Sequence, residues 1–507
     1  MIPTRCYLGR ILWPVALTLS SVLALVACDN PGPISTPPLI LPTQTVISGP
    51  PTPLPTLTLA PTVTPTPAPP GSFVPTAASY VLDITVDYEN HTLAARETVI
   101  FTNTLGVPLT ELRFYVPPNH TPGTLFLESL SVHQASLPPT FVYDLQADDL
   151  RLPFETPLQA GQIATVEMSF TVKPPRMRTT SIFGGGGLGW SENALNAGNW
   201  YPVLRPYQAG KGWYVFKWHA IGDPYVTDWA DYQATIIAPQ HVIVVGNGDL
   251  TRRGTAWSYR LRGRSFAFTA SHRYQSGTAP AGDATVESYW FPEHESVGRL
   301  VLTETARCLM LYADLFGPYP YAALRIAETD FNGGQEFSGI TFLGSGVYAD
   351  HLKSPQGPRT ILYTLIPHET AHQWWFGLVG SDQCREPWLD EALVQYSEMF
   401  FYERFYPADA AYRWEWMGNT VRRPGPINGT IYDYSKERPY KDAIYLTGAL
   451  FIGRLRETLG DERFFAFLRD YAAGYRGRLA TTADFFAVLD QHATPEEIAP
   501  LRQVFFP

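Results

Sequence analysis

Residues 368–375 read His-Glu-Thr-Ala-His-Gln-Trp-Trp and lie in an apolar run of helical length. Residues four apart in a helix lie on the same face, so His368 and His372 would present two imidazoles one turn apart. Two such imidazoles can hold one Zn²⁺, and Glu369 between them can orient a water molecule and take its proton. The stretch therefore predicts a helix that carries part of a zinc site.

A third ligand is expected downstream of this helix. Between His372 and Glu391, which lies in the segment Trp-Leu-Asp-Glu-Ala, there are 18 residues. A carboxylate at that position completes a set of two histidines and one glutamate, a ligand set of zinc hydrolases that leaves a coordination position open. The short motif alone occurs by accident, but its continuation and this spacing favour a real site for one Zn²⁺ per chain.

These motifs resemble those of the M1 family of zinc metallopeptidases, the gluzincin aminopeptidases. That family carries H-E-x-x-H, 18 residues and Glu, with G-x-M-E-N upstream and a Tyr downstream. Here the segment 333–337 reads GGQEF, and Tyr445 opens YLTGA, which resembles the family's Y-E-K-G-A. The resemblance runs from about residue 78 to the C-terminus and is strongest over 310–460. It implies a saddle-like N-terminal β domain followed by a mainly helical α+β, thermolysin-like catalytic domain.

The upstream motif indicates how the free end of a peptide would be held. The resemblance implies that the carboxylate of Glu336 binds the substrate's α-ammonium by a charge-assisted hydrogen bond. Gly333 and Gly334 would belong to the same substrate-binding edge strand. Binding of the ammonium is what makes the family exopeptidases. Gln335 and Phe337 replace the family's Met and Asn, which bears on specificity rather than on the chemistry because backbone contacts survive such replacements.

Two further roles fall on downstream residues. Tyr445 matches the family's Tyr that donates a hydrogen bond to the oxyanion of the tetrahedral intermediate, and Tyr440 is the alternative register. Glu398 lies seven residues after Glu391, on the same helical face, where it could accept a hydrogen bond from the far nitrogen of a ligating histidine. The family has a Glu at this spacing. Asp390 stands where the family usually has Asn.

Residues 78–278 are expected to form the β domain. The segments 79–88 and 165–172 alternate apolar and polar residues, turn residues separate such segments, and long helical patterns are absent. The family often supplies a second amine-binding Glu or Gln from this domain. Glu192 and Asn199 are nearby candidates, but neither gives a convincing match.

Residues 279–507 are expected to form the catalytic domain. Pro367 directly precedes His368, and a proline inside a helix removes one hydrogen bond, so a late helix start or a kink is expected there. After Glu391 only 116 residues remain, which leaves no room for the large helical domain that caps the cleft in many family members, and a more open cleft is expected. Helices are expected over 295–316, 361–376, 391–405 and 442–459, with a strand over 323–327.

Residues 1–28 are typical of a bacterial lipoprotein signal. Two arginines precede an apolar run over 11–27, which is short for a spanning helix, and the run ends in Leu-Val-Ala-Cys. Cys28 would be the lipidated first residue of the mature protein; an uncleaved N-terminal anchor is the alternative. Residues 29–77, rich in Pro and Thr, are expected to be a disordered linker. The body would then be tethered to a membrane outside the cytoplasm, on the cell surface or the periplasmic side.

Composition limits the remaining partners. The net charge is −10 and no basic cluster occurs, which argues against a nucleic-acid partner. Besides Cys6 and Cys28 the chain has only Cys308 and Cys384, between which one disulfide is possible. The sequence carries no signal for an oligomeric state.

The expected function is a zinc aminopeptidase that hydrolyses N-terminal residues from peptides. A thermolysin-like zinc endopeptidase is the first alternative, because the upstream motif is altered and the cleft is expected to be open. A non-catalytic surface module that keeps the fold for binding is the second. The intact ligand set, Glu369 and Tyr445 argue against the second alternative.

Overall fold

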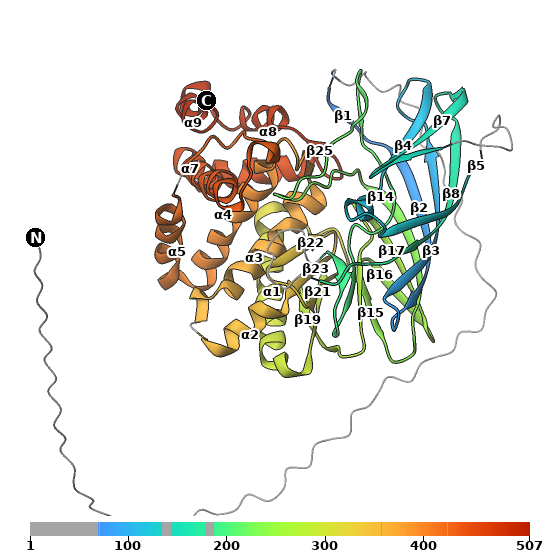
Figure 1. Ribbon diagram of the computed structural model, residues 1–507. Coiled ribbons are helices and arrows are strands. Elements are labelled where there is room, and N and C mark those ends of the chain that lie inside the picture. Colours follow the sequence, from blue (N-terminus) through green and yellow to red (C-terminus); the bar gives the residue numbers. More distant parts are fainter. Residues whose placement is uncertain (1–68, 70, 134–142, 178–186, 356, 423) are drawn as a thin grey trace, which may run out of the picture. The chain divides into compact units, whose positions relative to one another are not determined.

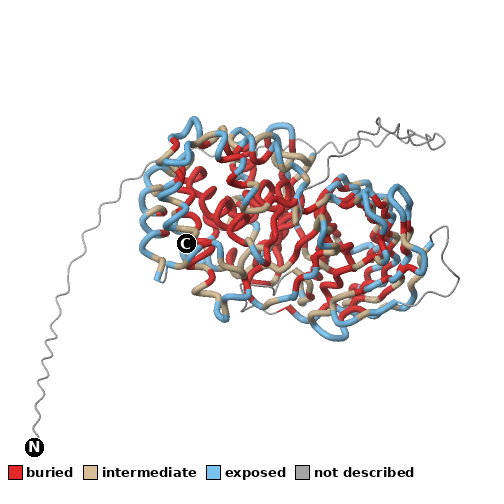
Figure 2. The backbone as a smooth tube through the Cα atoms, turned by 90° about the horizontal axis from the view of Figure 1, so that it is seen from above, coloured by how far each residue is buried: buried red, intermediate tan, exposed pale blue. Residues whose placement is uncertain are grey.

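Strands dominate the computed structural model up to Trp290, and helices dominate it from Glu295 onward (Figure 1). Buried residues fill the inside of both halves, and exposed residues cover the outside (Figure 2). None of the helices in the described part is both long and apolar enough to cross a bilayer. The structure describes residues 69, 71–133, 143–177, 187–355, 357–422 and 424–507. The signal segment with Cys28 and most of the predicted linker lie outside these residues.

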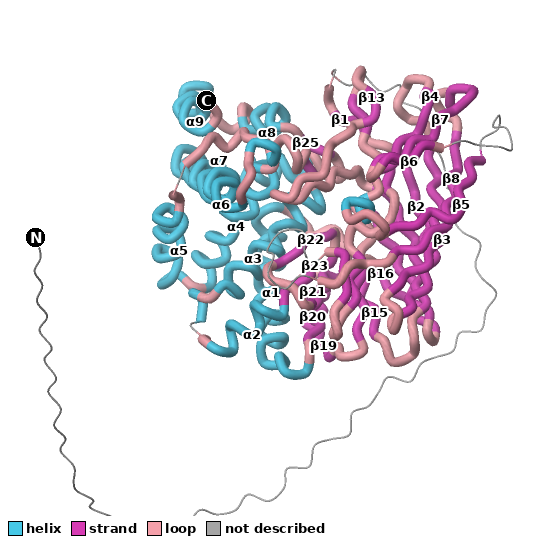
Figure 3. Tube along the Cα trace, in the orientation of Figure 1, coloured by secondary structure: helices cyan, strands magenta, loops and turns pink. Residues whose placement is uncertain are grey.

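A seven-stranded sheet is the largest layer of the β half (Figure 3). Three of its strands, β2, β3 and β8, alternate buried and more exposed side chains, because successive side chains of a strand point to opposite faces. The segments predicted from alternation fall in β2 and β8, so the expected β domain is confirmed. Across the sheet the strands are β16 (Asp249–Arg253), β17 (Ala256–Gly263), β14 (Ala230–Ile237), β2 (Ala77–Asp87), β3 (Thr92–Thr102), β8 (Ile163–Val172) and β5 (Leu125–His133).

Three smaller sheets complete this half. One contains β11 (Val203–Leu204), β4 (Leu109–Tyr115), β7 (Asp149–Leu158) and β6 (Asp144–Gln146). A second contains β15 (Ile243–Gly246), β18 (Phe268–Ser271), β10 (Leu195–Ala197) and β9 (Leu188–Trp190). The third contains β1 (Phe73–Val74), β12 (Tyr207–Gln208) and β13 (Gly212–Trp213). The fold thus begins before residue 78, inside the predicted linker, because the ring of Phe73 is buried edge-on against Tyr214.

A five-stranded sheet begins the catalytic domain. Its order is β19 (Gln275–Ala281), β20 (Ala284–Trp290), β21 (Ala323–Thr329), β23 (Ile340–Gly344) and β22 (Gly334–Phe337). The first strand, β19, begins four residues before the predicted boundary at residue 279; it is a mostly exposed edge strand and carries little apolar pattern. β22 pairs antiparallel with β23 and forms the other edge, as predicted for the GGQEF segment.

The helices pack against this sheet and against one another. The prediction for 295–316 is confirmed by α1, whereas the helix predicted over 361–376 is α-helical only to His372 and then continues as a π-helical segment, Gln373–Leu378. A second π-helical segment spans Lys441–Thr447, and a short two-stranded sheet pairs β24 (Gly380–Ser381) with β25 (Leu479–Ala480). The helices are α1 (Glu295–Phe316), α2 (Ser345–Lys353), α3 (Ile361–His372), α4 (Trp388–Phe405), α5 (Pro407–Thr420), α6 (Glu437–Tyr440), α7 (Gly448–Gly474), α8 (Thr482–Leu489) and α9 (Pro495–Phe505).

The helix α3 begins at Ile361 and runs through Pro367. Of the two expectations for this proline, a late helix start is therefore wrong. Proline has no N–H to donate to the preceding turn. Nearby, the hydroxyl of Tyr312 on α1 lies 3.2 Å from the carbonyl oxygen of Pro367 and 2.8 Å from that of Ser397 on α4. Tyr312 therefore joins three helices one residue before His368.

Two polar side chains, those of Gln373 and Arg264, connect β22 and the β domain to the π-helical segment that follows α3. The amide of Gln373 accepts from the N–H of Gly339 at 2.8 Å and donates to the carbonyl of Phe337 at 3.1 Å, which anchors β22. The buried guanidinium of Arg264, just after β17, donates to the carbonyl of Phe376 at 2.5 Å. The edge strand and the β domain are thus both fixed to the zinc helix.

Cys308 and Cys384 are both buried and free, so the disulfide that the sequence allowed is not present.

Candidate active site

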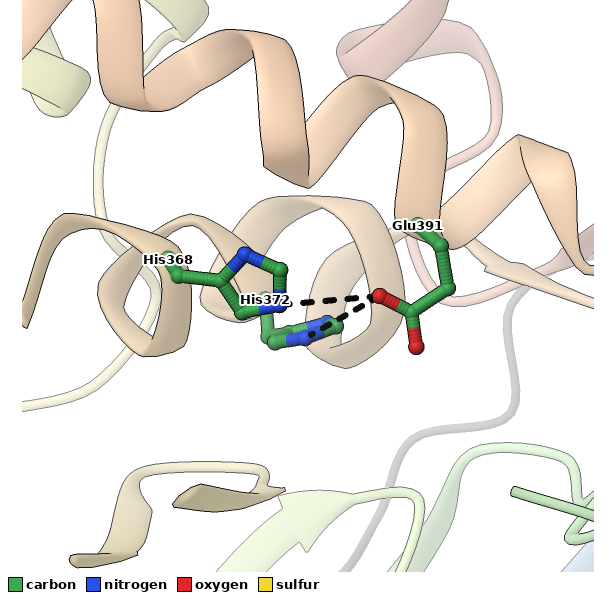
Figure 4. A group of neighbouring side chains, drawn as sticks. All are labelled: His368, His372 and Glu391. Carbon is green, nitrogen blue, oxygen red and sulfur yellow. Dashed lines mark ion pairs between the residues drawn. The ribbon is translucent and has the colours of Figure 1, made fainter. Parts of the chain in front are cut away.

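The helices α3 and α4 bring the three predicted zinc ligands together (Figure 4). The Nε2 atoms of His368 and His372 lie 3.6 Å and 3.9 Å from Oε2 of Glu391. Nitrogen and oxygen ligands bound about 2.1 Å from a tetrahedral zinc ion lie roughly 3.4 Å from one another. The spacing of the three atoms is therefore close to that of a zinc site.

The chemistry of Glu391 also fits a cation. Its buried Oε2 atom faces the two Nε2 atoms at 3.6 Å and 3.9 Å but has no donor within hydrogen-bonding distance among the described residues. Burying a carboxylate oxygen without a hydrogen-bond donor is costly, and a bound cation offsets that cost. The residues present therefore fit a zinc ion held by His368, His372 and Glu391.

Each histidine is oriented by a carboxylate on its far side. Nδ1 of His368 lies 3.1 Å from Oε1 of Glu398, and Nδ1 of His372 lies 2.8 Å from Oδ1 of Asp390. An Nδ1–H that donates to a carboxylate leaves the lone pair of Nε2 for a metal. With Nδ1 engaged in this way, the two Nε2 atoms face Glu391 and are the ring nitrogens available to a cation.

These two carboxylates are themselves held in place. Glu398 accepts from the amide of Gln395 at 2.6 Å and from Nε of Arg413 at 3.1 Å. Asp390 accepts from the amide of Gln383 at 2.7 Å. The structure places Glu398 where the sequence suggested, whereas the contact of Asp390 with His372 was missed.

The only sequence signal for Asp390 is its position beside Glu391 in the first turn of α4. One turn can offer both a carboxylate to the metal and a carboxylate to a ligating histidine. The sequence position does not tell which histidine Asp390 contacts, because that depends on how α4 packs on α3.

Glu369 faces the edge strand across the site. A Cβ atom at Gly334 would overlap its carboxylate, so this close approach requires glycine. Burial raises the pKa of the Glu369 carboxyl, while His372 and His368 lower it. A bound cation would lower it further. Glu369 is thereby a buried carboxyl beside the ligands, placed to exchange a proton.

Glu336 on β22 lies next to this group. One carboxylate oxygen of Glu336, one of Glu369 and a ring nitrogen of His372 lie within 4.8 Å of one another. Gln335 donates to Glu336 at 3.1 Å. Burial raises the pKa of Glu336 well above its usual range, and nearby carboxyls, first among them Asp223, add to that effect. A positively charged group would be attracted to this concentration of acid.

Asp223 is the site residue that sequence reasoning missed. It comes from the loop between β13 and β14 and lines the same cleft as the zinc ligands. Burial, followed by the charge of Glu391, raises the pKa of Asp223 to about 7. Of the two candidates named from the sequence, Glu192 is exposed and pairs with Arg176 at 2.5 Å, whereas Asn199 lines a neighbouring cavity whose lining also includes Glu336. An irregular loop has no periodicity that would have singled out Asp223.

Tyr445 lines the cleft, and its ring stacks parallel to that of His368 with 6.1 Å between the ring centres. Burial, with the charge of Glu391, raises the pKa of its phenol well above the usual range, so the phenol keeps its proton and can donate it in a hydrogen bond. Tyr440 is buried and does not line the zinc cleft. Of the two registers, the geometry favours Tyr445.

Residues 301–505 match the model of the Peptidase family M1 domain, a span that includes all three zinc-ligand candidates, Glu369 and Tyr445. Over these residues the chain thus carries a domain of peptidase family M1. The expected resemblance is confirmed there, and zinc is the metal that this family implies.

Among curated relatives, this chain is similar to Aminopeptidase M1-B of Oryza sativa subsp. japonica, with 27% identity over 215 residues, which are 39% of this chain and 24% of that protein. It is similar to Aminopeptidase N of Haemonchus contortus, with 25% identity over 221 residues, 41% of this chain and 23% of that protein. The match thus spans about a quarter of the length of these relatives.

Among solved structures, the M1 zinc metallopeptidase from Deinococcus radiodurans has a TM-score of 0.62 at 18% identity, covering 85% of this chain and 94% of that one. A variant of that protein with a bound Tyr-Ser-Ala substrate gives 0.61 at 17% identity, covering 86% and 95%. The likeness shows that this chain shares their fold, a β-rich region followed by a helical region, as expected.

Proposed function

We propose that this chain is a zinc aminopeptidase that removes N-terminal residues from peptides. The observation that carries the proposal is the closeness of Glu336 to the metal ligands: its carboxylate lies within 4.8 Å of a ring nitrogen of His372. Because one residue spans at most about 3.6 Å, a peptide whose ammonium lies on Glu336 presents only its first peptide bond to the metal. The names of the curated relatives support the same activity.

We propose one Zn²⁺ per chain, held by His368, His372 and Glu391. When bound, the ion supplies Lewis acidity, which polarises the scissile carbonyl and makes a water molecule more acidic. Glu398 and Asp390 hold the two imidazoles in orientation through Nδ1, so that each Nε2 faces the ion.

The remaining steps belong to the chain's own residues. Glu336, with Asp223 beside it, holds the substrate's ammonium. Glu369 takes a proton from the attacking water and passes it to the leaving amine. Tyr445 donates its phenol proton in a hydrogen bond to the oxyanion of the tetrahedral intermediate. One residue is released per cycle.

The test is cleavage of matched peptides by the purified full chain, one with a free and one with an acetylated N-terminus, with and without a chelator. Chelator-sensitive cleavage of the free peptide alone is expected. Because a charge-assisted hydrogen bond is worth about 1.5–3 kcal/mol, Glu336→Gln should lower kcat/KM for the free peptide by roughly 10- to 100-fold. Glu192→Gln, an exposed carboxylate outside the cleft, is the matched control.

One observation favours the endopeptidase alternative. A second cavity of about 480 Å³ adjoins the zinc cleft, and the two share Asp223, Gln335 and Glu336 in their linings. A peptide that extended past Glu336 would enter this cavity, and its internal bonds would then reach the metal. Equal cleavage of the free and acetylated peptides would replace the aminopeptidase with this alternative.

We also propose that the chain is tethered to a membrane through lipidated Cys28, outside the cytoplasm of a bacterium. The support is the sequence of residues 1–28, with its basic start, apolar run and final cysteine. We expect the wild type to incorporate a labelled fatty acid. The variant Cys28→Ser should carry no label and should be released from the membrane fraction. Membrane-bound protein without label would favour the uncleaved anchor.

A further inference from the structure

Three large apolar side chains lie exposed in the zinc cleft. Ile361 on α3 and Tyr412 and Trp416 on α5 are 54%, 43% and 40% exposed, and all three line the cleft that contains the zinc ligands. We call these three residues the α5 ledge, after the helix that supplies two of them. Single exposed apolar residues are ordinary, but several that share one ligand-sized cleft indicate a binding surface.

The contacts place the α5 ledge and Glu336 on opposite sides of the metal ligands. Glu336 lies beside His372. His368 contacts Glu398, which pairs with Arg413, and the guanidinium of Arg413 lies 4.4 Å from the centre of the Trp416 ring. In Figure 1, α5 and β22 likewise lie on opposite sides of α3.

The direction of a bound peptide follows from this arrangement and rests on the proposed function. With its ammonium on Glu336 and its first peptide bond at the metal ligands, the rest of the peptide leaves past His368. The cleft in that direction is lined by the α5 ledge. The residues that follow the scissile bond therefore pass along these apolar side chains.

The two aromatic rings of the ledge are held in place. The guanidinium of Arg359 lies 4.5 Å from the centre of the Tyr412 ring and donates to Asp409 at 2.7 Å. Arg413 lies over Trp416 and pairs with Glu398. Rings fixed in this way lose little freedom on binding, and since both arginines already have carboxylate partners, the ledge offers apolar surface rather than charge.

We propose that the α5 ledge binds a large apolar side chain of the peptide substrate on the leaving-group side of the scissile bond. The enzyme then selects peptides by a residue that it does not release.

The test uses pairs of peptides of equal length with a free N-terminus. The two peptides of a pair differ at one position, which carries Phe in one and Ser in the other. Separate pairs place this position second, third or fourth in the peptide. Burying a Phe side chain is worth about one or two factors of ten, so kcat/KM should favour Phe by about tenfold or more at one of these positions. Tyr412→Ser and Ile361→Ser should each reduce that preference, because each removes exposed apolar surface from the cleft lining.

The matched control is Ile163→Ser. Ile163 lies on β8 and is 55% exposed, almost the same as Ile361, but lies outside the cleft. The preference for Phe should be unchanged in this variant. An equal loss in Ile163→Ser and Ile361→Ser would overturn the proposal.

A binding measurement separates this proposal from the proposed function. The dissociation constants of the same peptides are measured on the zinc-loaded Glu369→Gln variant. Tighter binding of the Phe peptide supports the ledge even if the wild type cleaves none of the peptides. Cleavage with equal kcat/KM for Phe and Ser at every position overturns the ledge and leaves the aminopeptidase standing. Absence of both binding and cleavage overturns both.

Discussion

One buried carboxyl group of the β domain and two of the catalytic domain differ in their partners. Glu97 on β3 is fully buried in the core of the β domain, and neither of its oxygens accepts a hydrogen bond from the described residues. In the catalytic domain, Glu398 and Asp390 are equally buried, but each meets a histidine and at least one further donor. Burial is the same in both places, and the partners differ.

This difference separates a structural acid from a functional one. With no partner, desolvation alone raises the pKa of Glu97 well above its usual range, so the carboxyl stays neutral among apolar neighbours. In the cleft, carboxyl groups converge on two imidazoles and one another, which creates a site for cations. Burial alone therefore does not distinguish Glu97 from the acids of the cleft; the histidines and other donors that face Glu398 and Asp390 do.

The largest expected effect is at Glu369, whose carboxyl lies among the ligands. Glu369→Gln keeps the size of the side chain and removes the proton acceptor, so kcat should fall by about 10²- to 10⁴-fold. Steady-state kinetics and the zinc content of the same preparation check this. Full activity of the zinc-loaded variant would sink the mechanism.

The next effect is at Tyr445. Loss of one oxyanion donor typically costs about 10²- to 10³-fold in kcat, so Tyr445→Phe should show such a loss with KM little changed. Tyr440→Phe is the matched control, since Tyr440 is buried outside the cleft lining. If Tyr440→Phe lost more activity than Tyr445→Phe, the alternative register would be the right one.

A smaller effect is expected from the carboxylates behind the histidines. Removal of such a partner typically weakens metal binding by about 10- to 100-fold, so Glu398→Ala and Asp390→Ala should each do so in a competition titration with a chelator. Asp390→Asn keeps an oxygen that can accept from His372 and should lose less. Equal losses in Asp390→Asn and Asp390→Ala would show that charge rather than hydrogen bonding matters at this position.

The smallest effect concerns stability at Glu97. Its pKa is raised on folding, so the folded state binds more protons than the unfolded state above pH 4.5, and stability is lost as pH rises from there toward the raised pKa. Each pH unit in that window costs about 1.4 kcal/mol. The melting temperature of Glu97→Gln should therefore exceed that of the wild type by an amount that grows as the pH increases. The melting temperature of the exposed control Glu155→Gln should follow that of the wild type. A constant difference between pH 5 and pH 8 would contradict a neutral Glu97.

Much of the fold was readable from local pattern. Strand alternation located β2 and β8, and helical spacing located α1, because the period of burial is a local property of the chain. The boundaries were less accurate: β19 is mostly exposed, and Phe73 is apolar but stands in a Pro- and Thr-rich segment. In both cases tertiary contacts, rather than local pattern, decide where the domain begins.

By itself the sequence determined the zinc-ligand candidates, because the spacing of His368 and His372 fixes two imidazoles on one helical turn and the family resemblance supplies Glu391. It also pointed to Glu369, Glu336, Glu398 and Tyr445. Only the tertiary structure decided that Asp390 contacts His372, that a loop of the β domain brings Asp223 to the cleft, and that α5 lines its far side. These depend on how α4 packs on α3 and how the β domain meets β22, and such long-range packing leaves no periodic signal in the chain.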